Sequence, residues 1–108
     1  MARRVRRGEI WLYHFRAPDK IRPVLVLTRN AVIEHLHTVI VAPITSTARD
    51  IPTEVAVGVQ QGLKRESRIV LDHVFSVEQA RLRQFVGSVD EQKMAAVCRA
   101  LAIATGCA

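Results

Sequence analysis

Short apolar runs alternate with polar breaks along most of the chain, and this pattern predicts a mainly β domain. Residues 24–28 form an uninterrupted run of Val, Leu and Thr, which is typical of a central strand covered on both faces. Within residues 53–59 valine recurs at every second position, which is typical of a half-buried strand. The strands expected from these runs are residues 9–15, 24–28, 39–44, 53–59 and 68–72.

Polar residues, proline and glycine separate these runs. They predict a loop at residues 16–20 and a short helical turn between residues 29 and 37. Residues 74–88 predict strand ends around a turn of helix near residues 78–82. Because no long helix separates most of the strands, the pattern favours a small closed barrel over a parallel, doubly wound sheet.

The C-terminal segment predicts one amphipathic helix packed on this barrel. Asp90 can cap its start, as can Ser88 in a capping box with Glu91, and Gly106 can end it. The apolar side chains that recur at helical spacing between these ends are Met94, Val97, Cys98, Leu101 and Ala104.

The length of 108 residues fits one domain. We expect a basic N-terminal tail at residues 1–7 and a single domain at residues 8–108. The longest apolar runs fall far short of the roughly 18 residues needed to cross a bilayer, so we expect no membrane association and a cytoplasmic location. Cys98 and Cys107 are expected to be free thiols, with Cys98 as buried filler.

The positive charge is concentrated in one half of the chain. The formal net charge is +6, and residues 1–49 hold nine Lys or Arg against three acids, whereas residues 50–108 hold seven of each. A clustered positive field attracts phosphates, so the distribution suggests a polyanionic partner such as nucleic acid. A basic tail that serves solubility is the alternative for the arginines of the first seven residues.

A few side chains could carry chemistry, although the chain lacks a Gly-rich phosphate loop, a G-x-S-x-G motif and an H-E-x-x-H motif. Pro23 favours an extended backbone at Arg22, which would hold its guanidinium as a rigid phosphate fork, with an ordinary ion pair as the alternative. Thr45 begins a run of three hydroxyl residues that suits either a turn or a phosphate site. His73 follows the fifth expected strand and could transfer a proton.

Five segments together resemble one family in order and spacing. They are RGEIW at residues 7–11, RPVLVLT at 22–28, VAPITST at 41–47, PTEV at 52–55 and VLDH at 70–73. In this combination the chain resembles the MazF/PemK/Kid toxins of bacterial toxin-antitoxin pairs, from about residue 7 to residue 106.

The resemblance implies a fold, an activity and a set of catalytic residues. The implied fold is an SH3-like barrel of the MazF/CcdB type, mainly β with a C-terminal helix, that forms a homodimer. The implied activity is endoribonuclease cleavage of single-stranded mRNA at a short sequence without a metal or other cofactor, which stops translation and growth. The catalytic pair of the family falls on Arg22 and Thr45, and the acid assigned a role in some branches falls on Asp72.

The RNA would be cut by attack of its own ribose 2′-OH, which leaves a 2′,3′-cyclic phosphate and a 5′-OH. The general base stays open among Asp72, His73 and Arg22. Part of the loop at residues 16–21 binds substrate in relatives. The side chains expected to contact RNA are Arg16, Lys20, Arg29, Ser46, Thr47, Arg49 and His73.

The resemblance also implies a protein partner. A cognate MazE-like antitoxin, with an acidic flexible tail, would neutralise the toxin, and operator DNA would be bound only through the toxin-antitoxin complex. Two alternatives use the same scaffold. One is a nucleic-acid-binding SH3-like module without catalysis, and the other is a toxin that poisons DNA gyrase, as the related CcdB proteins do.

Overall fold

The computed structural model describes residues 5–15 and 20–108. Its strands are β1 (Glu9–Phe15), β2 (Lys20–Val26), β3 (Thr38–Thr45), β4 (Glu54–Val57), β5 (Ser67–Val70), β6 (Phe75–Glu78) and β7 (Gln84–Ser88). Its α-helices are α1 (Asn30–Ile33) and α2 (Glu91–Thr105). Short 3₁₀ helices lie at η1 (Val59–Gln61), η2 (Leu71–His73) and η3 (Gln79–Arg81).

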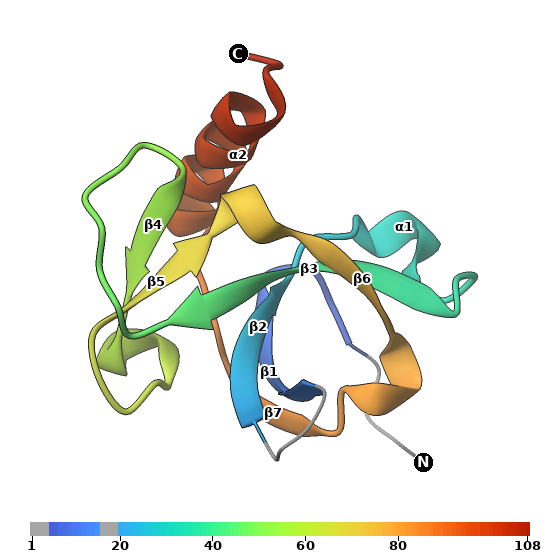
Figure 1. Cartoon of the computed structure of the whole chain (residues 1–108). Coiled ribbons are helices and arrows are strands. Elements are labelled where there is room, and N and C mark those ends of the chain that lie inside the picture. The colour runs from blue at the N-terminus through green and yellow to red at the C-terminus, as the bar shows by residue number, and fades with distance from the viewer. Residues whose placement is uncertain (1–4, 16–19) are drawn as a thin grey trace.

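The strands form one curled antiparallel sheet with the order β4-β5-β3-β2-β1-β7, and β6 pairs with β3. β3 holds the sheet together, because its residues 38–41 pair with β6, its residues 41–43 pair with β2 and its last two residues pair with β5 (Figure 1). Helix α2 packs at one end against β4 and η2 (Figure 1). The expected mainly β barrel with a C-terminal helix is therefore confirmed.

The sheet buries one apolar cluster on each face. Leu25 and Val26 are both fully buried, and because successive strand side chains alternate, they belong to different clusters. The cluster under α2 contains Leu25 and Val97, and the cluster inside the curl contains Trp11 and Val26. The continuous apolar run of β2 thus reflects a strand covered on both faces, as predicted.

Helix α2 is capped by Asp90 and not by Ser88, the other residue considered for this role. The carboxylate of Asp90 accepts a hydrogen bond of 2.8 Å from the backbone N–H of Lys93, and Gly106 ends the helix with a φ of 75°. The expectation that Cys98 is buried is wrong. Cys98 is exposed, and its Sγ lies 3.1 Å from Nη2 of Arg7. None of the helices in the described part of the chain has the length and apolar character needed to cross a membrane.

Several boundaries differ from those expected, and each has a local cause. β2 begins at Lys20 because it pairs with β1 from that residue onward, although its first three residues are exposed and leave no apolar pattern. The strand expected to reach residue 59 ends at Val57, where a 3₁₀ turn follows. Val5 is 2% exposed and packs in the cluster inside the curl, so the packed body begins before the expected boundary at residue 8.

Candidate functional site

Arg22 and Thr45 come from neighbouring strands and line one cavity. Val24 of β2 lies opposite Pro43 of β3. Arg22 and Thr45 each lie two residues beyond this last pair of the β2–β3 ladder, at the same end of the two strands. Both side chains line an open cavity of about 580 Å³. The two residues singled out as a catalytic pair are therefore brought together by the fold.

Most of the charged side chains that line the cavity are basic. Its basic side chains are Lys20, Arg22, Arg49 and His73. Among the lining residues that the structure describes, Glu54 is the single carboxylate, so positive charge exceeds negative charge on this part of the cavity wall. This surplus is what a phosphodiester requires of a binding site.

The hydroxyl of Thr45 is held by a local turn. Its Oγ1 accepts a hydrogen bond of 3.2 Å from the backbone N–H of Thr47, whose side chain lines the same cavity. This bond uses one lone pair of the oxygen and leaves the O–H able to donate. The sequence suggested either a turn or a phosphate contact for this run of hydroxyl residues. Thr45 can serve in both roles at once.

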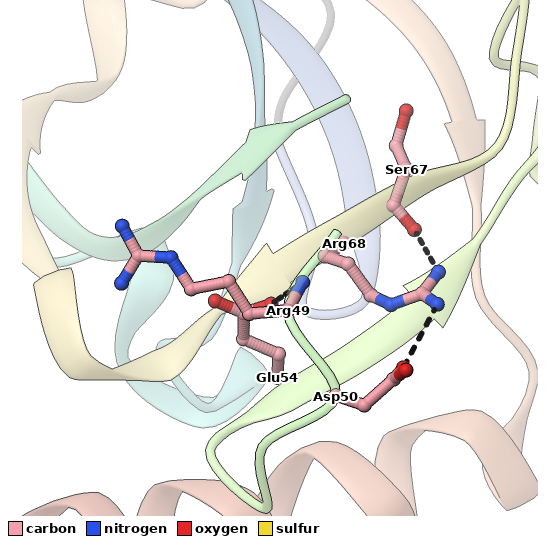
Figure 2. Close-up of polar contacts among 5 residues, drawn as sticks. All are labelled: Arg49, Asp50, Glu54, Ser67 and Arg68. Carbon is pink, nitrogen blue, oxygen red and sulfur yellow. Dashed lines mark hydrogen bonds and ion pairs between the residues drawn. The ribbon is translucent and has the colours of Figure 1, made fainter. Parts of the chain in front are cut away.

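Two polar contacts fasten the segment that carries Arg49. The backbone N–H of Arg49 donates a hydrogen bond of 3.2 Å to Oε1 of Glu54 (Figure 2). A guanidinium nitrogen of Arg68 lies 3.6 Å from Oδ1 of Asp50, and a second one donates a hydrogen bond of 3.2 Å to the carbonyl of Ser67. Figure 2 shows the guanidinium of Arg49 extending away from this ion pair. Arg68 is thus engaged in holding the loop, whereas Arg49 is presented at the cavity.

Asp72 lies apart from the cavity that Arg22 and Thr45 share. It sits in the 3₁₀ turn η2, not at the end of a strand, and its Oδ2 accepts a hydrogen bond of 2.6 Å from the hydroxyl of Thr53. Its neighbour His73 does line the cavity. The two adjacent residues proposed for proton transfer therefore face different surroundings.

The remaining RNA-binding candidates divide between three places. Lys20, Thr47 and Arg49 line the cavity of Arg22, as described above. Ser46 lines a second cavity of about 650 Å³, which Arg22 also borders. Arg29 is exposed just before α1 and lines neither cavity, and Arg16 lies outside the described residues.

Six lining residues were not anticipated from the sequence, and those among them with an aromatic or charged side chain are Phe15, Glu54 and Phe75. Phe15 belongs to an alternating set with Trp11 and Tyr13, and that alternation could have placed it on the same face as Arg22. Glu54 directly precedes the alternating valines of β4, and this alternation indicates less clearly which face of the strand Glu54 occupies. Phe75 lies in a segment whose pattern was ambiguous, and only its pairing with β3 brings it to the cavity.

No group of three or more His, Cys, Asp or Glu within residues 5–15 and 20–108 is arranged to hold a metal ion. The chemistry that the described cavity offers is fixed positive charge, hydroxyl groups and an imidazole. These are groups that bind phosphate, stabilise negative charge and move protons.

Comparisons with known sequences identify one family. Residues 6–105 match the sequence profile of the PemK-like, MazF-like toxins of type II toxin-antitoxin systems. The probable endoribonuclease MazF5 of Mycobacterium tuberculosis is 37% identical over 102 residues, which cover 94% of this chain and 93% of that relative.

Solved structures of similar chains share the fold. The toxin MazF-mt6 of Mycobacterium tuberculosis superposes with a TM-score of 0.82 at 34% identity, over 93% of this chain and 97% of that one. A mycobacterial endoribonuclease in complex with its cognate antitoxin superposes with a TM-score of 0.83 at 27% identity, over 94% of this chain and 95% of that one. Both similarities extend over nearly the whole length of the chain.

Proposed function

Because this chain belongs to the family of PemK-like, MazF-like toxins of type II toxin-antitoxin systems, we propose that it is the endoribonuclease toxin of such a pair. It cleaves single-stranded mRNA at a short recurring sequence and thereby stops translation and growth. The observation that carries the residue assignment is the shared cavity of Arg22 and Thr45, which combines a guanidinium with a hydroxyl in a basic surrounding.

The reaction uses the RNA's own nucleophile. The ribose 2′-OH attacks the adjacent phosphorus, the bond to the 5′-oxygen breaks, and the products carry a 2′,3′-cyclic phosphate and a 5′-OH. Arg22 supplies positive charge to the non-bridging oxygens as negative charge develops on the pentacovalent phosphorane. Thr45 donates a hydrogen bond from its hydroxyl to the same phosphate and holds it in line. The protein's groups suffice for this chemistry without a metal or other cofactor.

Proton transfer is assigned to His73 in this scheme: its imidazole takes the proton of the 2′-OH and returns a proton to the departing 5′-oxygen. Its side chain borders the cavity of Arg22, and an imidazole both accepts and donates protons near neutral pH. Asp72 is a positioning residue, because its bond to Thr53 ties the turn that carries His73 to the start of β4.

The basic cavity also fits the regulation of such a toxin. A cognate MazE-like antitoxin with an acidic segment binds the toxin homodimer and blocks access to Arg22, and operator DNA is bound through the antitoxin. The structural relative solved with its cognate antitoxin supports this partner. The toxin acts in the cytoplasm, where its mRNA substrate is located.

The decisive experiment incubates the purified protein with mixed-sequence single-stranded RNA in EDTA and maps the new termini. We expect cuts at one short recurring sequence, with a cyclic phosphate on the upstream product and a 5′-OH on the downstream product. DNA of the same sequence should stay intact because it lacks the 2′-OH. Intact RNA together with salt-sensitive binding would instead support a non-catalytic module.

A further inference from the structure

We propose that Phe15 and Phe75 form a stacking platform for an unpaired base of the nucleotide next to the cleaved phosphate. The inference rests on the proposed function, since the phosphate is the one that Arg22 and Thr45 bind. The proposed ligand is an unpaired nucleobase. It would contact a wall of the cavity that has no part in the cleavage chemistry.

The two rings are presented to the cavity by different strands. Phe15 is the last residue of β1 and Phe75 is the first of β6, and both line the cavity with their side chains only half-buried. Their ring centroids lie 5.5 Å apart with an angle of 48° between the planes. The rings are therefore neighbours that together form an apolar wall beside the basic groups.

The platform is supported from behind. The ring of Tyr13 makes edge contacts with Phe15 at 5.0 Å and with Phe75 at 5.8 Å, although it does not line the cavity itself. The guanidinium carbon of Arg81 lies 5.2 Å from the centroid of the Tyr13 ring. Packing of this kind fixes both phenyl rings, so little conformational entropy is lost when a base stacks on them.

The placement of the rings relative to the phosphate-binding groups matches a nucleotide. Lys20 lies opposite Phe15 in the β1–β2 ladder, and Arg22 lies two residues further along β2, which corresponds to about 7 Å of strand. One nucleotide of extended RNA covers such a step. Basic groups that hold the backbone beside aromatic rings that hold bases are the combination by which proteins bind single-stranded nucleic acid.

The test measures how much the binding contribution of one RNA base depends on the phenyl ring of Phe75. The ligands are single-stranded oligoribonucleotides that contain the cut sequence. Each carries a 2′-deoxy sugar at the cleaved nucleotide, because removal of the 2′-OH prevents cleavage. Each also carries one abasic site, placed at a different position in each oligonucleotide. Binding is measured for the wild type, for Phe75→Leu, which removes the ring and keeps an apolar side chain, and for Phe75→Tyr, which keeps the ring. Phe85→Leu is the matched control, because Phe85 is 38% exposed and borders the other cavity.

For the wild type and Phe75→Tyr, an abasic site at one position beside the cleaved phosphate should weaken binding about five- to 150-fold. In Phe75→Leu the same abasic site should cost less than about twofold, because the stacking partner is already gone. Phe85→Leu should keep the full penalty at that position. An abasic penalty in Phe75→Leu equal to that of the wild type, at every position, would overturn the platform.

A second readout keeps this result separate from the proposed function. 2-Aminopurine at the sensitive position should lose fluorescence on binding to the wild type and keep it on binding to Phe75→Leu, and neither signal requires cleavage. Cleavage by the wild type without this difference refutes the platform alone. The difference in fluorescence without any cleavage of normal RNA refutes the nuclease alone.

Discussion

The hydroxyl of Thr53 donates a hydrogen bond of 2.6 Å to the carboxylate of Asp72. The backbone N–H of Leu71 adds a bond of 3.0 Å to the carbonyl of Thr53, so the start of β4 and the turn η2 are joined twice. Asp72 is thereby engaged on one side of the turn, while His73, the next residue, borders the cavity of Arg22.

This relationship predicts that Asp72 contributes more to the stability of the turn than to the chemical step. Asp72→Ala and Thr53→Val should each lower the free energy of unfolding by about 1 kcal/mol, and the double variant should lose no more than the larger single loss. Urea unfolding measures the three values. The kcat of Asp72→Ala on RNA should stay within about tenfold of the wild type. A loss as large as that of Arg22→Ala would instead identify Asp72 as a catalytic residue.

Arg22 should be indispensable for cleavage even when another cation replaces it. Arg22→Ala is expected to lower kcat by about 100- to 1,000-fold, the usual cost of removing a preorganised charge from a transition state. Arg22→Lys should recover little, because an ammonium lacks the planar fork that contacts two phosphate oxygens. Arg29→Ala is the control for general loss of positive charge, since Arg29 is exposed and lines neither of the two cavities that Arg22 borders. Equal losses in Arg22→Ala and Arg29→Ala would contradict the assignment.

Thr45 should require its hydroxyl and not its methyl group. Thr45→Val keeps the β-branched shape but removes the donor, and we expect at least a tenfold lower kcat. Thr45→Ser keeps the donor and should retain most of the activity. Circular dichroism should show both variants folded. Activity of Thr45→Val near that of the wild type would remove Thr45 from the site.

Local pattern predicted the strands that are covered on both faces, because burial leaves a continuous apolar run such as residues 24–26. It could not predict the start of β2, because Lys20 and Arg22 are exposed and this part of the strand follows from its pairing with β1. Nor could it predict that Phe75 reaches the cavity, because that depends on the contact of β6 with β3 more than thirty residues earlier.

For the candidate site too, the sequence predicted some features, whereas others depend on contacts between distant segments. Arg22 and Thr45 were singled out through motifs that resemble a family, and the antiparallel pairing of β2 with β3 explains why residues so far apart in sequence line one cavity. Asp72 lay in the same kind of motif, yet its hydrogen bond to Thr53 depends on a second turn that no local pattern reveals. A residue's neighbours in space are set by strand pairing, and the sequence carries that information only indirectly.

Val5 should contribute to stability although it precedes the first strand. It is 2% exposed and packs in the cluster inside the curl. Val5→Ala should therefore lower the free energy of unfolding by about 1–3 kcal/mol in urea titrations. Val59→Ala is the matched control, because Val59 is 70% exposed and its loss should be close to zero. Equal stability of the two variants would mean that Val5 is not packed in solution.

The close approach of Gly62 and Gly87 predicts a site that tolerates no side chain. A Cβ on Gly87 would lie 2.0 Å from the carbonyl oxygen of Gln61, and a Cβ on Gly62, whose φ is +94°, would lie 2.4 Å from the carbonyl oxygen of Val86. The approach is possible because the β1–β7 ladder shifts register between residues 10 and 11 and skips Val86.

Gly87→Ala should therefore lower the free energy of unfolding by about 3 kcal/mol, because a rigid backbone must move to admit the methyl group. Gly106→Ala is the control, since a Cβ there meets nothing within 4 Å and only its φ of +75° is unfavourable, at about 1 kcal/mol. A variant as stable as the wild type would show that η1 and β7 separate readily, and the second cavity would then have no fixed wall.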